Sequence, residues 1–298
     1  MKLQELFQKT SAYWVRYNEY EYKEKDGELF ILPVPKANPT VYDPIKVADE
    51  LVVDALNIGI FCMRQNPNEE RIKASIIDFA VKYGLLGFMT ALPTTPEFMD
   101  YEAVYLPLNP IIMAESMDTK EYVDMFFPFE KLDFCKKGRE SRWDINNDRD
   151  MMALFMTFQD KPTAMNMSFQ RNYAERYDWL RGKFKDWAYS LCASVFFYEE
   201  KDATVRDLHR QAMSAFGGIA PNYRISLYDD GPKIVWDFHS LLQTIQMIFS
   251  FALTDDQKPI RLCRYCNRAF VPQDARAAFC SPECKNKFNV YKSRSKNK

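Results

Sequence analysis

The most informative stretch of this sequence runs from Arg261 to Lys298 and reads RLCRYCNRAFVPQDARAAFCSPECKNKFNVYKSRSKNK. Four of the seven cysteines lie here, in the order Cys263-x2-Cys266-x13-Cys280-x3-Cys284. Two close cysteine pairs separated by a short loop are typical of a tetrahedral Zn²⁺ site. These four thiolates are therefore predicted to hold one zinc ion. Because they occupy all four coordination positions, the metal would be structural and not catalytic.

The residues around the two pairs predict a treble-clef zinc finger. The first pair flanks a tight turn before the short apolar stretch 269–271, as in a zinc-knuckle hairpin. Ser281 can cap a helix and Pro282 suits its first turn, so Cys284 is expected one turn into that helix. The alternatives are four unpaired structural cysteines or a disulfide framework. The second is disfavoured because the other three cysteines are scattered and the sequence shows no secretory signal.

The tail also carries most of the positive charge imbalance of the chain. Residues 261–298 hold ten Lys or Arg and two Asp or Glu, whereas the whole chain has a net charge of −1. The rest of the chain is therefore acidic. A basic segment on an acidic protein indicates an anionic partner, most commonly nucleic acid. The alternative is that the acidic part of the same chain docks the basic tail.

Cationic and amide side chains of the finger are the candidate nucleic-acid contacts. The cations suit phosphate groups, and the two asparagines could reach base edges if the helix enters a major groove. For each single lysine, the alternative is a solvated cation near a helix C-terminus. The candidate set is Arg264, Arg268, Lys285, Asn286, Lys287, Asn289, Lys292, Arg294 and Lys296.

The same tail resembles the bacterial CGNR-type zinc fingers. In those fingers Gly-Asn-Arg follows the last cysteine; here Lys285-Asn286-Lys287 follows Cys284, so the Asn matches and its neighbours differ. The approach to the finger is also similar, with a hairpin, an apolar helix and Leu-Cys-x-x-Cys from Asn222 onward. CGNR fingers end bacterial proteins thought to be transcription regulators, so the resemblance implies DNA ahead of RNA as the partner. The rest of the chain resembles only uncharacterised bacterial proteins.

Upstream of the finger, the sequence predicts a mainly α-helical body over residues 1–258, followed by the finger as a second domain over residues 259–298. Asp230-Gly231, between two alternating runs, predicts one small β-hairpin over 223–236. Because the linker before the finger is short, the finger is expected to pack on the body. Apolar spacing and capping residues predict helices over 1–22, 44–63, 67–83, 118–127, 168–200, 204–216 and 238–252.

No catalytic motif is present, and neither His209 nor His239 has a partner at ligand or triad spacing. The leading hypothesis is a zinc-finger nucleic-acid-binding protein of the bacterial transcription-regulator type. One alternative is an interaction protein in which the finger is only a structural clasp. Another is an enzyme whose site in the helical body no motif reveals.

Membrane and export signals are not found in the sequence. No apolar run is long enough to span a bilayer, and the first residues lack the apolar core of a signal peptide. A cytoplasmic protein without membrane contact is therefore expected, and in that compartment reduced thiols favour metal binding over disulfides.

Overall fold

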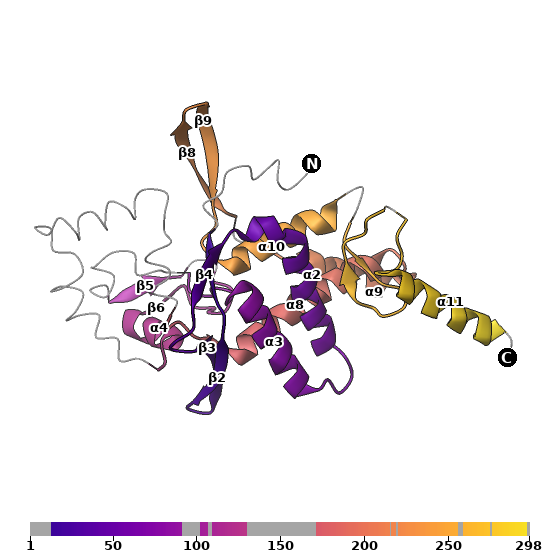
Figure 1. Ribbon diagram of the computed structural model, residues 1–298, viewed down its shortest axis with the longest axis horizontal. Helices are drawn as coiled ribbons and strands as arrows, with labels where there is room; N and C mark the ends of the chain where they lie inside the picture. The colour runs from indigo at the N-terminus through magenta and orange to yellow at the C-terminus, as the bar shows by residue number, and fades with distance from the viewer. Residues whose placement is uncertain are drawn as a thin grey trace, which may run out of the picture. The chain divides into compact units, whose positions relative to one another are not determined.

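The computed structural model describes residues 13–90, 102–106, 109–129, 171–214, 216–218, 220–255, 259–274 and 276–296 (Figure 1). Of these residues, 46% are helical and 21% lie in strands, which form several small sheets. The protein is a mixed α/β fold. The prediction of a mainly α-helical body with one small hairpin is therefore wrong.

Most of the predicted helices are present, and their capping residues set their ends. Asn68 Oδ1 accepts a hydrogen bond from Arg71 N (3.0 Å) at the start of α3, and Gly84, with φ of +92°, follows its last residue. Asp118 Oδ1 accepts from Glu121 N (2.9 Å) and caps α4 as predicted. The helices are α2 (Ala48–Cys62), α3 (Glu69–Tyr83), α4 (Thr119–Phe126), α8 (Tyr177–Phe197), α9 (Ala203–Ser214), α10 (Leu241–Thr254) and α11 (Pro282–Lys296), with a 3-10 turn η1 (Pro44–Val47) before α2.

The strands form one three-stranded sheet, in the order β2-β3-β7, and four two-stranded sheets, β1-β4, β5-β6, β8-β9 and β10-β11. All pairings are antiparallel. The strands are β1 (Trp14–Tyr17), β2 (Tyr20–Lys25), β3 (Glu28–Pro33), β4 (Pro39–Tyr42), β5 (Ala103–Tyr105), β6 (Ser116–Asp118), β7 (Glu175–Arg176), β8 (Asn222–Tyr228), β9 (Gly231–Asp237), β10 (Arg261–Leu262) and β11 (Ala269–Phe270).

The N-terminal segment accounts for much of the difference from the prediction. Residues 14–25 form β1 and β2, not the predicted helix, whose first twelve residues lie outside the described part. Aromatic and β-branched side chains such as Trp14, Val15 and Tyr17 favour strands, and all three are buried here. Asp26 and Gly27 both adopt positive φ (53° and 80°), as a two-residue hairpin turn between β2 and β3 requires.

The chain folds as two compact units, each built from three separate segments. The second unit contains the finger. The domain boundary that the sequence predicts, at residue 258, falls outside the described residues and stays a prediction. Unit 1 comprises Met1–Lys46, Ile77–Leu180 and Ile219–Thr244; unit 2 comprises Val47–Ile76, Arg181–Gly218 and Ile245–Lys298.

Unit 1 has an aromatic core around a buried carboxylate. The ring of Phe126 stacks on Tyr173 (centroids 5.8 Å apart) and meets Trp179 edge-on (5.8 Å). Beside them lies Glu175, which is 0% exposed. Because Glu175 belongs to β7 and pairs with Ile31 of β3, helix α8 begins at Tyr177 and not at the predicted residue 168.

Unit 2 packs helices closely at one glycine. A Cβ atom on Gly59 of α2 would lie 1.9 Å from the carbonyl oxygen of Phe184 in α8. The missing side chain therefore allows the two backbones to touch, and the neighbouring Trp187 and Leu191 are buried.

Among the described helices, none combines the length and the apolar character that crossing a bilayer requires.

Candidate metal centre

The four cysteines of the finger converge on one point. Their Sγ atoms all lie within 4.8 Å of one another. Sulfur to sulfur, Cys266 and Cys280 are 3.7 Å apart and Cys280 and Cys284 are 3.5 Å apart. A tetrahedral ion with sulfur ligands at about 2.3 Å places those sulfurs about 3.8 Å from each other. The donor set and its spacing therefore fit one metal ion, and the predicted grouping of these residues is confirmed.

The knuckle that carries the first pair is held by backbone hydrogen bonds. Asn267 N donates to Cys263 O (2.9 Å), and Cys263 N donates to Arg268 O (2.9 Å). Asn267 has φ of 57°, a left-handed conformation that asparagine tolerates better than most residues. Arg264 N donates to Ala278 O (3.1 Å), which brings the loop before Cys280 alongside the knuckle.

The second pair lies at the start of α11, as predicted. Ser281 Oγ accepts a hydrogen bond from Cys284 N (3.2 Å), and Pro282 is the first residue of the helix. This places Cys284 in the first turn, facing Cys280 and the knuckle. Sequence reasoning is therefore confirmed at both ends of the site.

Electrostatics set the four thiols apart. Burial opposes ionisation of the Cys263 thiol, but backbone N–H groups of Cys266, Cys280 and Tyr265 lower its pKa to about 6. The pKa of Cys280 is raised by burial and by the neighbouring thiols. Four close sulfurs cannot all ionise unless a cation neutralises them, and a bound divalent ion does this.

The finger has little hydrophobic core of its own. Cys263 is 0% exposed, whereas Phe279 and Phe288, whose ring centroids are 5.2 Å apart, are only half-buried. Tyr265 and Tyr291 meet at 6.4 Å, and Tyr291 remains 69% exposed. A module of this size cannot fold on so small a core, so its stability depends on the metal site or on a neighbour.

Such a neighbour is helix α2. Asn57 Nδ2 donates to Ala269 O (3.2 Å), and Ala269 N donates to Asn57 Oδ1 (2.8 Å). One side chain thus satisfies both polar groups of a buried backbone position in β11. Sequence reasoning missed Asn57; the available signal was a single amide within the otherwise apolar stretch of α2 from Ala55 to Cys62.

Replacing Asn57 by alanine is expected to loosen the finger from α2. Both polar groups of Ala269 would lose their partner in a buried position, at a cost of about 1–3 kcal/mol. Hydrogen exchange of the Ala269 amide should accelerate by about tenfold or more. Asn57→Asp keeps the acceptor and loses the donor, so it should give an intermediate rate. Equal rates in all three proteins would show that this contact does not hold the finger.

The structure places the other predicted contact residues around the finger surface. In the described residues, the side chains of all except Lys296 can be assigned, and every one of these is exposed. They divide between the knuckle and α11. The exposed set is Arg264, Arg268, Lys285, Asn286, Lys287, Asn289, Lys292 and Arg294.

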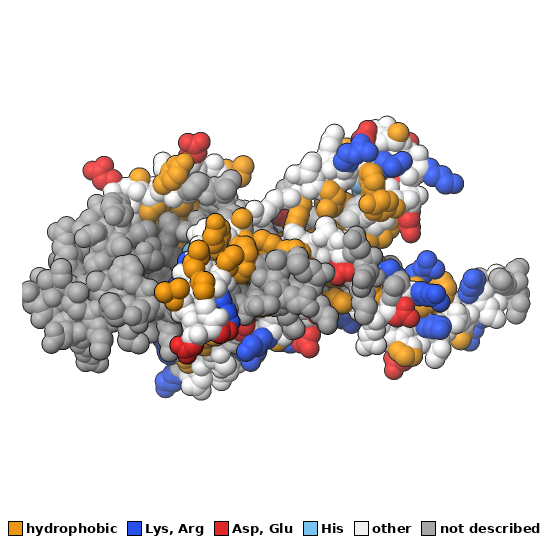
Figure 2. Space-filling view, turned by 90° about the horizontal axis from the view of Figure 1, so that it is seen from above, with side chains coloured by type: hydrophobic (Ala, Val, Ile, Leu, Met, Phe, Trp, Pro, Cys, Tyr) orange, Lys and Arg blue, Asp and Glu red, His pale blue; other side chains and the backbone are white. Residues whose placement is uncertain are grey.

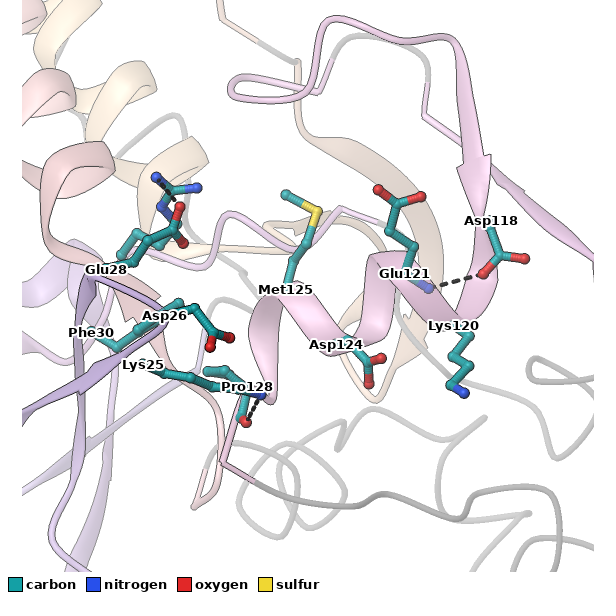
Figure 3. Close-up of a pocket in the computed structure, with 11 residues that line it drawn as sticks. Lys25, Asp26, Glu28, Phe30, Asp118, Lys120, Glu121, Asp124, Met125 and Pro128 are labelled. Atoms are coloured by element: carbon teal, nitrogen blue, oxygen red, sulfur yellow. Dashed lines mark hydrogen bonds and ion pairs between the residues drawn. The ribbon is translucent and has the colours of Figure 1, made fainter.

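Unit 1 contains a separate pocket of about 460 Å³, between the β2–β3 turn and α4 (Figure 3). Arg176 pairs with Glu28 (2.8 Å), and Lys25 Nζ donates to Pro128 O (2.5 Å), so two of its three cations are already engaged. Its carboxylates are Asp26, Glu28, Asp118, Glu121 and Asp124.

These carboxylates do not converge. Figure 3 shows Glu121 and Asp124 pointing to opposite sides of α4, and Asp118 lies at the far end of that helix from Asp26. Among the described residues, the four cysteines are the only cluster found that could hold a metal. The pocket therefore offers neither a paired acid and base nor a metal site.

Comparison with family models, with curated proteins and with solved structures finds no match to this chain.

Proposed function

We propose that the four cysteines hold one structural zinc ion, and that the finger built around it binds nucleic acid. Four thiolates in a tetrahedral arrangement suit zinc or iron among the common metals. Zinc is the choice for an isolated site that closes a treble-clef finger. Because cysteine fills every coordination position, the ion would fix the shape of the finger and take no part in a reaction.

The exposure of α11 is the observation that carries this proposal. From Lys285 to Ser295, every side chain except Phe288 is exposed. A helix that is polar on nearly all sides gains little from packing, and short isolated helices are marginal in water. Such a helix is expected where a partner supplies the missing contacts.

The charge of α11 indicates what that partner is. Figure 2 shows blue side chains along the free end of this helix, at the right of the view. Within the described part of the chain, no ion pair involves Lys285, Lys287, Lys292 or Arg294. This favours an external polyanion over docking of the tail on acidic residues of the same chain.

Duplex DNA is the form of nucleic acid we propose. An α-helix fits the major groove, where asparagine pairs with adenine through two hydrogen bonds. Asn286 and Asn289 are exposed on α11 among the cations, so base contacts and phosphate contacts could be made together. The resemblance to CGNR-type fingers supports the same partner and a role in transcription regulation.

Reversing two charges of α11 tests this proposal. Lys285→Glu/Lys292→Glu should bind mixed-sequence duplex DNA at least tenfold more weakly at low salt in fluorescence anisotropy. If both lysines contact phosphates, the slope of log affinity against log salt should fall by about two. These side chains are exposed, so folding should be unaffected.

Lys36→Glu is the matched control, because it reverses an exposed lysine in unit 1. It should bind as the unmodified protein does. Absence of binding to duplex DNA, single strands and RNA at low salt would rule out the nucleic-acid proposal and leave the zinc assignment standing.

The double contact between Asn57 and Ala269 favours a second candidate, in which the finger is a structural clasp of unit 2. The two candidates differ in what metal removal does. In a clasp, chelation would lower the unfolding free energy of α2 and α8, and no nucleic acid would bind with or without metal. In a nucleic-acid-binding finger, chelation would abolish a measurable affinity.

A further inference from the structure

The hairpin β8-β9 presents one continuous apolar face. Its register places three apolar pairs on the same side: Tyr223 with Trp236, Ile225 with Ile234, and Leu227 with Pro232. The rings of Tyr223 and Trp236 meet edge-on at 5.8 Å. No charged residue belongs to this set, which we call the apolar stripe.

This hairpin is amphipathic in the reverse of the usual sense. Tyr223, Ile225, Leu227 and Ile234 of the apolar stripe are 65%, 70%, 85% and 52% exposed. On the opposite face, Val235 is 3% exposed, and the polar side chains beside it are half-buried. The apolar face is thus the more open one, although a sheet with one wet face normally directs its polar side to water.

An apolar surface of this kind needs a cover. Figure 1 shows the hairpin extending away from the other strands of its unit. A two-stranded hairpin is at best marginally stable in water by itself. The exposed part of the stripe amounts to about 400–500 Å², which is at the upper end of what monomeric proteins leave open.

We propose that the apolar stripe is covered by the same stripe of a second copy of this protein. A two-fold interface requires a self-complementary surface, and a flat stripe of apolar pairs satisfies this without any charge to match. At the tip, Asp230 already pairs with Lys233 in the same hairpin, so these two charges do not call for a charged partner. Two stripes face to face would bury on the order of 1,000 Å², where specific interfaces begin.

An interface of this size predicts a reversible dimer whose population depends on concentration. Sedimentation equilibrium from about 1 µM to about 100 µM should follow a monomer–dimer equilibrium. Ile225→Glu/Leu227→Glu would place four carboxylates in the dry interface and should weaken association by at least a hundredfold. Both positions are exposed, so the circular dichroism spectrum should not change.

Met113→Glu is the matched control, because Met113 is 95% exposed in unit 1 and lies outside the stripe. It should dimerise like the unmodified protein. As a measurement that needs no variant, hydrogen exchange of residues 222–237 should slow as protein concentration rises. A protein that stays monomeric throughout this range, or a dimer that the stripe variant leaves intact, would overturn the proposal.

Discussion

A Cys280→Ser protein is expected to be purified without zinc and with an unfolded finger. Structural zinc contributes roughly 10–16 kcal/mol in isolated fingers, so one of four thiolates accounts for about 3 kcal/mol. That loss exceeds what the half-buried pair Phe279 and Phe288 can supply. Zinc content should fall from one ion per chain to near zero, and amides of residues 282–296 should exchange without protection.

The matched control is Cys192→Ser, which removes a half-buried cysteine of unit 2 outside the site. It should keep one zinc ion per chain. Unit 1 should remain folded in both variants, because none of its segments contributes a sulfur. One zinc ion per chain in the Cys280→Ser protein would contradict the four-thiolate site.

The finger could be predicted because its information is local. The ligand spacing, the cap at Ser281 and the short apolar strand before the loop lie within one stretch of sequence, and metal geometry leaves few ways to join them. The contact with α2 could not be predicted in the same way. Asn57 and Ala269 are 212 residues apart, and only the folded chain brings them together.

The N-terminal strands had a local signal that the helical spacing concealed. Asp-Gly between alternating residues marks a hairpin, and at Asp230-Gly231 this signal predicted β8-β9 correctly. The same dipeptide at Asp26-Gly27 was interpreted only as the end of a helix. Apolar periodicity is ambiguous in a segment this rich in aromatic residues, since β1 buries side chains on both faces.

Glu175 had no such signal. A glutamate near the start of a long helical pattern is expected on a wet surface, and here it is fully buried. Its hydrogen-bond partners are three successive backbone N–H groups of residues 86–88, far away along the chain. Those groups follow the end of α3, where Gly84 and Gly87 adopt positive φ, and a buried carboxylate satisfies them in place of water.

Replacing Glu175 by alanine is expected to unfold unit 1 or bring it close to unfolding. The N–H groups of Leu86, Gly87 and Phe88 would be left buried without an acceptor, at a cost of about 1–3 kcal/mol each. Together this approaches the whole stability of an ordinary domain, about 5–15 kcal/mol. Urea titration followed by tryptophan fluorescence should show a much lower midpoint, or no folded baseline.

Glu21→Ala is the matched control, since it also removes a glutamate from a strand of unit 1. Glu21 forms only a surface ion pair with Lys23 (2.8 Å), so its loss should cost at most about 1 kcal/mol. If the two alanine variants unfold at the same urea concentration, the backbone groups around Glu175 do not depend on its carboxylate.

The pH dependence separates the charge of Glu175 from its role as acceptor. Burial raises its pKa from 4.5 to about 7, although Tyr173 and the backbone N–H groups of residues 86–88 oppose the shift. Between these two values the folded state holds a proton that the unfolded state has released. This contribution to stability is therefore complete below pH 4.5 and is lost as the pH rises to about 7, by on the order of 3 kcal/mol.

Glu175→Gln removes this titration and keeps one oxygen to accept from the backbone. The variant should be less stable than the unmodified protein at pH 5, because its amide cannot serve all three N–H groups. Its unfolding free energy should then change less between pH 5 and pH 7 than that of the unmodified protein. Parallel pH profiles for the two proteins would mean that Glu175 is already ionised in the folded state at pH 5, held there by the four donors around it.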